Sequence, residues 1–250
     1  MPGAAGGAGA CRPHRGTGFL SVPRFIVRWV KFSGFGEHAV DFYDGLLADN
    51  SKAYWDDHVA IYKTEVRAPM EALLGELEGE FGAGFGAGKV FRPYRDVRFA
   101  RDKTPYKTHC GGVLEAGRGG GAYYVELGPD GLRVGGGCFH LAADQLARFR
   151  TAVDTELHGP ALGRILASLR RRGWEVLGDR LKSRPRGYAE DHPRIDLLRY
   201  RSVYAIRVWE PDGFLHERET LDRVRKAWRQ VREFNEWARD HVGPSEQPRR

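Results

Sequence analysis

Residues 122–139 read A-Y-Y-V-E-L-G-P-D-G-L-R-V-G-G-G-C-F, and this stretch decides the fold class. Its two halves, 122–127 and 132–139, are rich in β-branched and aromatic residues, which favour strands. Between them stands Pro129-Asp130-Gly131. Proline fixes φ and glycine accepts a positive φ, so this tripeptide predicts a tight turn. The sequence therefore predicts an antiparallel β-hairpin in the middle of the chain.

Further strands are predicted on either side of the hairpin, at residues 90–101, 174–177 and 203–208. Apolar residues at helical spacing predict helices toward both ends of the chain. Pro69 predicts a kink or a restart in one of them, because proline donates no amide hydrogen bond. The predicted helices cover residues 37–48, a segment with Tyr54 and Trp55, and residues 61–81, 142–155, 160–172 and 220–241.

These elements predict a single α+β domain, with a mainly antiparallel sheet from the middle third flanked by N- and C-terminal helices. The chain has 250 residues, enough for one large domain. Residues 1–31 are rich in glycine and alanine and have no apolar period, so we expect a disordered extension there. The predicted domain covers residues 32–242, and residues 243–250 are predicted to be a disordered tail.

Charge and cysteine content narrow the class of protein only partly. Forty Lys and Arg against 33 Asp and Glu give a net charge of +7, which a high-GC coding bias would also produce. The charge alone therefore does not indicate nucleic-acid binding. Three cysteines without a C-x-x-C pair indicate a reducing compartment, and no apolar run approaches the ~18 residues of a membrane span. We expect a cytoplasmic protein with no membrane partner.

Two motifs that suggest a cofactor or a metal do not meet the requirements of their class. F-G-A-G-F-G-A-G-K at 81–89 lacks the first glycine of a phosphate-binding loop and the Ser or Thr after its lysine. His109-Cys110 and Cys138-x-His140 would supply zinc ligands, but their spacing matches no finger or deaminase motif. We therefore expect no cofactor and no metal.

The segment richest in chemistry is residues 91–109, F-R-P-Y-R-D-V-R-F-A-R-D-K-T-P-Y-K-T-H. Six basic and two acidic residues give it a net charge of +4. Guanidinium groups present a planar fork of donors that suits phosphate and carboxylate. Strand alternation would place at least one arginine on a partly buried face, and we expect Asp96 to pair with Arg98.

The leading hypothesis is a site for a small anionic ligand, bearing phosphate or carboxylate, on this strand and the loop after it. The three glycines at 135–137, in the predicted strand 132–139, would admit the ligand close to the backbone. No spacing of a nucleophile, a base and an orienting residue in the sequence establishes an enzyme. Three residues nearby are nevertheless suited to proton transfer. The predicted ligand-binding residues are Arg95, Arg98, Lys103, Tyr106, Lys107, Gly135, Gly136 and Gly137, and the proton-transfer candidates are Asp96, Asp102 and His109.

Two alternatives remain open. The same segment would serve a nucleic-acid-binding module, with Phe91, Tyr94, Phe99 and Tyr106 as stacking groups. It would also serve a structural or partner-binding domain in which its acids neutralise its arginines. The sequence gives no oligomeric state.

The string R-D-V-R-F-A-R-D-K-T-P-Y-K-T-H at 95–109 resembles the signature of the domain of unknown function 2461 family, conserved hypothetical proteins of bacteria and fungi. The resemblance covers about residues 32–240. Ala100 stands where the family usually has a small polar residue, so no hydroxyl role is carried over to it. The resemblance implies an α+β single domain and no activity, substrate or cofactor. Further segments that carry it are Phe32–Phe35, Asn50–Trp55 with Tyr62, Gly135–Gly137, Leu146 with Phe149 and Arg150, Pro185 with Gly187 and Tyr188, Asp191–Pro193, and Leu197-Leu198.

Overall fold

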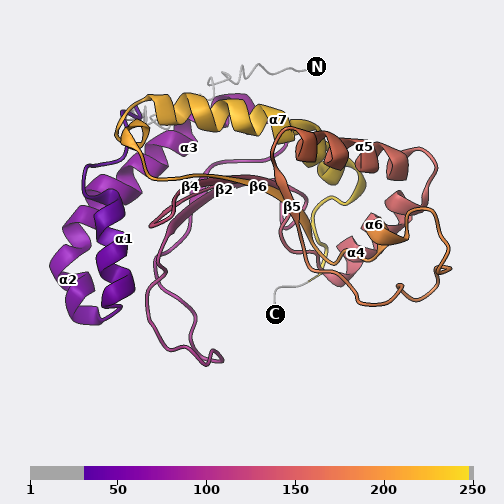
Figure 1. Cartoon of the computed structure of the whole chain (residues 1–250), viewed down its shortest axis with the longest axis horizontal. Coiled ribbons are helices and arrows are strands. Elements are labelled where there is room, and N and C mark those ends of the chain that lie inside the picture. The colour runs from indigo at the N-terminus through magenta and orange to yellow at the C-terminus, as the bar shows by residue number, and fades with distance from the viewer. Residues whose placement is uncertain (1–30, 248–250) are drawn as a thin grey trace, which may run out of the picture.

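The computed structural model describes residues 31–247. The extension predicted at 1–31 therefore lies, except for Lys31, outside the described residues. The described part is a single α+β domain built on one six-stranded sheet with the strand order β1-β2-β3-β4-β6-β5 (Figure 1). Every neighbouring pair is antiparallel. The strands are β1 (Lys89–Val90), β2 (Cys110–Glu115), β3 (Ala122–Gly128), β4 (Gly131–Cys138), β5 (Glu175–Leu177) and β6 (Val203–Trp209).

The predicted hairpin is confirmed. Leu127 pairs with Leu132 and Gly128 with Gly131, so the chain reverses at Pro129-Asp130. Gly131 has φ +94°, a conformation that favours glycine. The turn fixes the register of β3 against β4, and this register decides which side chains share a face.

Within the described residues, seven α-helices accompany the sheet. A π-helical segment, Tyr62–Arg67, joins α2 to α3, and a short 3₁₀ turn, Gly213–His216, precedes α7. Pro69 lies in the first turn of α3, directly after this segment. The backbone is right-handed helical at Ile61, Arg67 and Ala68, so the helix neither ends nor restarts before Pro69. The helices are α1 (Ala39–Ala48), α2 (Lys52–Ile61), α3 (Ala68–Phe81), α4 (Ala143–Asp154), α5 (His158–Arg171), α6 (Ile195–Leu198) and α7 (Glu219–His241).

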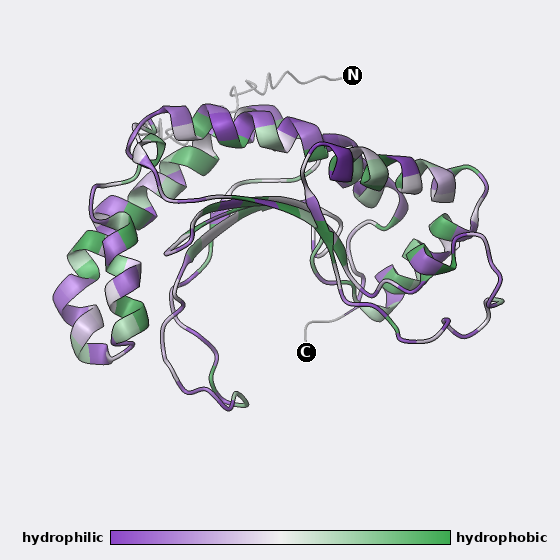
Figure 2. Cartoon of the chain, viewed as in Figure 1, coloured by the Kyte–Doolittle hydropathy of each residue, from purple (hydrophilic) through white to green (hydrophobic). Residues whose placement is uncertain are grey.

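Helices α3 and α7 cover one face of the sheet (Figure 1). Trp228 of α7 is fully buried, with its ring centroid 5.2 Å from that of Tyr123 and 5.4 Å from that of Phe81. The outward side of α7 is hydrophilic, whereas the strands beneath it are largely hydrophobic (Figure 2). The apolar stripe predicted for this helix is confirmed, because its members are buried: Leu221, Val224, Trp228, Val231, Phe234 and Ala238.

The glycines of β4 allow α7 to lie close to the sheet. A Cβ atom at Gly136 would come within 2.7 Å of Val231 Cγ2, and one at Gly137 within 2.5 Å of Phe234 Cε1. Burial of the α7 stripe against β4 therefore requires positions without side chains.

The opposite face of the sheet is concave. Helices α1 and α2 border it on one side, and α4 and α6 on the other, and no described helix lies across its middle (Figure 1). In register, this face presents Tyr124 and Glu126 of β3, Arg133 of β4, and Tyr204 and Ile206 of β6, all of them half-buried. We call it the concave face.

The prediction of a strand at residues 90–101 is wrong. Only Val90 belongs to a strand, and residues 91–109 form a projecting arm closed by a single bridge between Tyr94 and Tyr106 (Figure 1). Asp102 Oδ1 accepts the backbone N–H of Thr104 at 2.9 Å, and the Asp96 carboxylate likewise accepts that of Arg98 at 3.3 Å. Such local side-chain hydrogen bonds compete with a strand ladder. We call residues 91–109 the arm.

The sheet instead continues through β2, which follows the arm and which the sequence analysis did not predict. Its Cys-Gly-Gly start has low strand propensity, and pairing with β1 and β3 overrides it.

Residues 243–247, the described part of the predicted tail, contact the domain. Ser245 N–H donates to the Arg118 carbonyl, and Glu246 N–H donates to Asp144 Oδ2, both at 2.9 Å. Within residues 31–247, no helix is both long and apolar enough to cross a membrane.

Candidate functional site

The base of the arm is fixed to the helical side of the domain. The side-chain amide of Asn50 donates to the Tyr106 carbonyl at 3.1 Å and accepts the Tyr106 N–H at 3.0 Å. The Tyr106 ring stacks on Trp55 and is 5 % exposed. Tyr106, which the sequence analysis assigned to the ligand site, therefore holds the arm in place through buried contacts.

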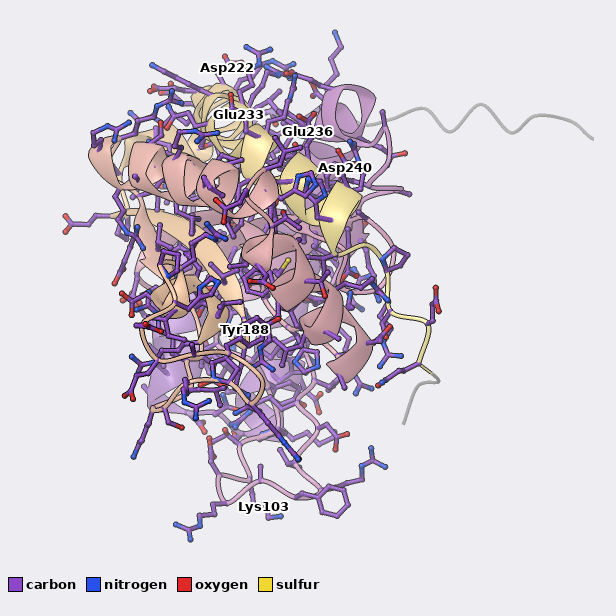
Figure 3. The ribbon with its side chains drawn as sticks, turned by 90° about the vertical axis from the view of Figure 1, so that its right-hand side faces the viewer. Lys103, Tyr188, Asp222, Glu233, Glu236 and Asp240 are labelled. Carbon is purple, nitrogen blue, oxygen red and sulfur yellow. The ribbon has the colours of Figure 1, made fainter. Side chains whose placement is uncertain are left out.

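The tip of the arm points away from the sheet, and Figure 3 shows Lys103 at its far end. The Lys103 ammonium donates to the Val97 carbonyl at 2.9 Å. The predicted pair of Arg98 and Asp96 forms at 2.6 Å, but the two side chains are 77 % and 45 % exposed. Arg98 and Lys103 thus lie on an open surface and do not line a pocket with the other predicted residues.

Arg95 is the half-buried arginine of the arm, with 30 % of its side chain exposed. Its guanidinium bonds Asp102 Oδ2 at 2.5 Å and also the Thr104 hydroxyl. Hydrogen bonds from Thr104 and Arg95 lower the pKa of Asp102 to about 2, and the Arg98 guanidinium lowers that of Asp96 to about 2. Both carboxylates are therefore ionised at neutral pH and weak as proton acceptors.

A hollow of about 430 Å³ lies between the base of the arm and α1. Of the predicted residues, it brings together Arg95, Tyr106 and Lys107 with Asp102 and His109. A second hollow, of about 250 Å³, shares Leu47, Thr108 and His109 with the first and extends to Glu126 and Arg133. We call the two together the arm-base hollow; it opens on the concave face at His109.

Lys107 lines this hollow together with Arg95 and Arg133, but unlike them it has no carboxylate partner among the described residues. Its side chain is half-buried, its ammonium lies 5.3 Å from the ring centroid of Phe91, and no carboxylate of residues 31–247 forms an ion pair with it. Burial, followed by the nearby Arg92 charge, lowers the pKa of Lys107 below its ordinary value of 10.5. The domain therefore holds a positive charge partly out of water without compensating for it.

A polar cluster on the concave face, which the sequence analysis missed, adjoins Lys107. Glu126, 13 % exposed, accepts a hydrogen bond from Arg133 at 2.9 Å and another from the Tyr124 hydroxyl. His109 Nε2 lies 3.8 Å from Glu126 Oε2. Strand alternation would have found Tyr124 and Glu126 on one face, and the turn at 129–131 would have placed Arg133 opposite Glu126.

Burial sets the protonation of this cluster. It raises the pKa of Tyr124 well above its ordinary value of 10.0, and the Glu126 carboxylate raises it further. Burial lowers the pKa of His109 below 6.5, against an opposing effect of Glu126 and with support from Lys107 and Arg133. At neutral pH His109 is therefore an uncharged imidazole, which is able to accept a proton from a bound molecule.

A family model described as "Conserved hypothetical protein (DUF2461)" matches residues 38–237, which include the arm, all six strands and most of α7. The chain belongs to the DUF2461 family. No curated protein and no solved structure matches it.

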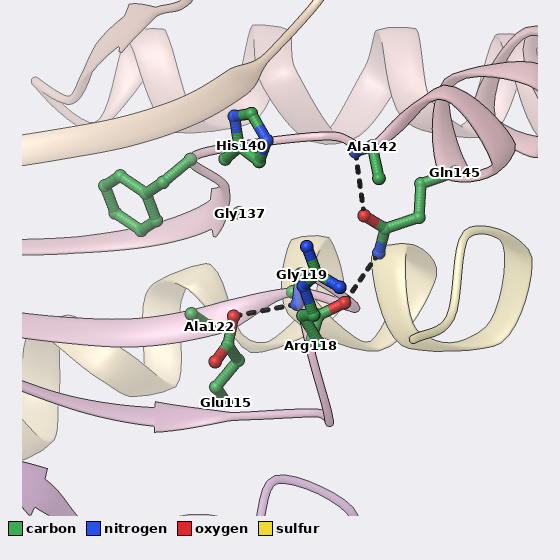
Figure 4. Close-up of a pocket in the computed structure, with 10 residues that line it drawn as sticks. Glu115, Arg118, Gly119, Ala122, Gly137, His140, Ala142 and Gln145 are labelled. Carbon is green, nitrogen blue, oxygen red and sulfur yellow. Dashed lines mark hydrogen bonds between the residues drawn. The ribbon is translucent and has the colours of Figure 1, made fainter. Parts of the chain in front are cut away.

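The glycine strand of this DUF2461 chain lies apart from the arm-base hollow. Gly137 lines a different cavity, of about 130 Å³, with Glu115, Arg118, His140 and Gln145 (Figure 4). The polar groups of that cavity bond one another: Glu115 accepts the Gly119 N–H at 2.8 Å, and the Gln145 amide donates to the Arg118 carbonyl at 2.9 Å. The structure does not bring Gly135, Gly136 and Gly137 together with Lys107.

The described residues of the DUF2461 chain contain no group of three or more His, Cys, Asp or Glu side chains placed to hold a metal ion. Cys110 and Cys138 are buried, and burial raises the pKa of each thiol to about 12. Both cysteines are therefore protonated at neutral pH and unsuited to nucleophilic attack.

Proposed function

We propose that this protein binds a small anionic ligand, bearing a phosphate or carboxylate group, in the arm-base hollow. Lys107 is the counterion of the ligand, and His109 is the neighbouring group that exchanges a proton or a hydrogen bond with it. The single observation that carries the proposal is the half-buried Lys107 ammonium without a carboxylate partner in the described residues.

Two physical arguments support the proposal. A partly desolvated charge without a counterion costs free energy, and a bound anion removes that cost. Lys107 and His109 are two residues apart, and both line the same hollow, whose volume of about 430 Å³ suits a small molecule. Arg95 stabilises the arm through Asp102, so we assign it to the wall and not to the contact with the anion.

The proposal is tested by titrating the protein with inorganic phosphate, sulfate and citrate and measuring the melting temperature. A ligand that binds only the folded state raises the melting temperature saturably. Lys107→Met should abolish the rise. Lys103→Met is the matched control, since Lys103 lies on the same arm at an exposed position, and it should keep the wild-type response. An unchanged response in Lys107→Met would contradict the proposal.

Nucleic-acid binding by the tip of the arm is a second candidate, favoured by one observation. Phe99 is 97 % exposed, and Arg98, Arg101 and Lys103 surround it in the sequence. Exposed aromatic rings among basic residues are typical of stacking on unpaired bases. A single-stranded oligonucleotide should then bind with an affinity that falls steeply with salt, and Phe99→Ala should weaken it. An affinity independent of salt and of Phe99 would exclude this candidate.

A further inference from the structure

Four aromatic rings form a row across the concave face. The row runs from Phe91 at the start of the arm to Tyr124, with ring centroids 6.4 Å apart, and then to Phe139 at 5.3 Å. Phe139 and Tyr204 stack at 4.7 Å, with 22° between their planes. All four residues are half-buried. We call these residues the aromatic row.

A position without a side chain makes room for the row. Gly135 of β4 lies in register between Tyr124 and Ile206, and a Cβ atom there would lie 3.1 Å from Phe139 Cζ. The glycine lets the Phe139 ring lie against the sheet between Tyr124 and Tyr204. On the helix-covered face, by contrast, the Tyr123 ring is buried against Trp228 of α7.

The row begins beside Lys107 of the arm-base hollow. The Lys107 ammonium lies 5.3 Å from the centroid of Phe91, the first ring of the row. The polar cluster of Glu126, Arg133 and the Tyr124 hydroxyl lies beside the second ring. A charged group on Lys107 and a planar group on the row would therefore be held side by side.

We infer that the anionic ligand also carries a planar aromatic or heteroaromatic ring, which stacks on the aromatic row, and that it is the size of a mononucleotide. The inference rests on the proposed function, which places the negative charge of the ligand at Lys107. It adds that the ligand belongs to the class of ring-bearing anions. Ring stacking on aromatic side chains is favourable for any base, because each base has a π face.

The charges of the concave face favour a small ligand over a nucleic-acid strand. Glu115 and Glu175 lie on this face, in register with Ala122 of β3 and Ile206 of β6. The charge of Arg133 is matched by Glu126. A strand needs several phosphates neutralised along its path, and these carboxylates would repel it.

The test compares ligands with and without a ring by isothermal titration calorimetry. The probes are the four ribonucleoside 5′-monophosphates, ribose 5-phosphate and inorganic phosphate. We expect at least one nucleotide to bind about tenfold or more tightly than ribose 5-phosphate, which corresponds to the lower part of the stacking range. Tyr124→Leu, at the ring of the row next to Phe91 and Lys107, should remove this difference and leave the binding of inorganic phosphate unchanged. Phe99→Leu, at the exposed tip of the arm, is the matched aromatic control and should preserve it.

The outcomes separate the inference from the proposed function. If inorganic phosphate and ribose 5-phosphate bind but no nucleotide binds more tightly, the ring is excluded and the anion site stands. If no nucleotide binds, the inference is wrong, and if inorganic phosphate, sulfate and citrate also fail to bind, the proposed function is wrong as well. A nucleotide preference that Phe99→Leu removes and Tyr124→Leu keeps would place stacking on the arm and overturn the inference. Tighter binding of an oligonucleotide than of every mononucleotide, with a steep salt dependence, would also overturn it.

Discussion

Trp55 of α2 and Tyr106 of the arm stack face to face, with ring centroids 4.4 Å apart and 6° between the ring planes. Together with the two hydrogen bonds of Asn50, this contact fixes the base of the arm. Lys107 is the next residue after Tyr106, so the same contact decides where its ammonium lies. The anchoring of the arm and the proposed anion site are thus parts of one arrangement.

Asn50→Ala should destabilise the domain by about 1–3 kcal/mol, because the substitution leaves the N–H and carbonyl of Tyr106 without partners. The stability of Asn50→Asp should lie between those of the wild type and Asn50→Ala, since aspartate keeps the hydrogen-bond acceptor and loses the donor. Urea denaturation measures both variants. An Asn50→Ala midpoint equal to the wild type would show that the arm base does not depend on this amide.

Asp96→Ala should leave the urea midpoint unchanged, because the pair with Arg98 is exposed and surface ion pairs contribute little. Glu126→Ala provides the contrast. It removes the shared acceptor of Arg133 and Tyr124 at a mostly buried position and should cost about 1–3 kcal/mol. Equal effects of the two substitutions would mean that the burial of Glu126 has no energetic consequence.

Lys107→Met should raise the melting temperature in a buffer free of binding anions. The folded-state pKa of Lys107 lies below 10.5, so the charged form is held less favourably in the folded than in the unfolded state at neutral pH. The expected rise is at most about 2–4 °C, the shift that 1 kcal/mol produces in a domain of this size, and loss of the contact with Phe91 offsets part of it. Lys103→Met should show no rise, and a fall in Lys107→Met would argue against an uncompensated charge.

His109→Gln should reduce the loss of stability in mild acid. The pKa of His109 is lowered in the folded state, so the unfolded state takes up a proton first as the pH falls through about 6.5. The unfolding free energy therefore decreases below that pH, and glutamine removes this contribution. Urea midpoints measured at several pH values from about 7 to 5 test this, and parallel curves for the variant and the wild type would contradict it.

Gly136→Ala should destabilise the domain by about 1–3 kcal/mol, because its Cβ atom would lie 2.7 Å from Val231 Cγ2 at the contact of β4 with α7. Gly79→Ala is the matched control. Gly79 lies in α3 with no neighbouring atom within 4 Å of a Cβ, so alanine should stabilise the helix by about 0.5–1 kcal/mol. The prediction is confirmed if Gly136→Ala lowers the melting temperature and Gly79→Ala raises it. Equal shifts of the melting temperature in the two variants would refute it.

Local signals in the sequence determined the α+β class, the hairpin at 122–139 and the buried stripe of α7. The turn Pro129-Asp130-Gly131 acts through backbone preferences of its own residues, and the stripe repeats at the period of a helix. The arm was mistaken for a strand because its alternation matches one, while its local Asp96 and Asp102 hydrogen bonds oppose it.

Only the tertiary structure decided which basic residue faces a hollow and which faces solvent. Lys103 and Lys107 are four residues apart on one arm, and the difference between them comes from Asn50 and Trp55, which are distant in the sequence. The aromatic row joins residues from 91 to 204 in the same way. Alternation along a strand separates its two faces, but only the packing of α3 and α7 decides which of them the helices cover.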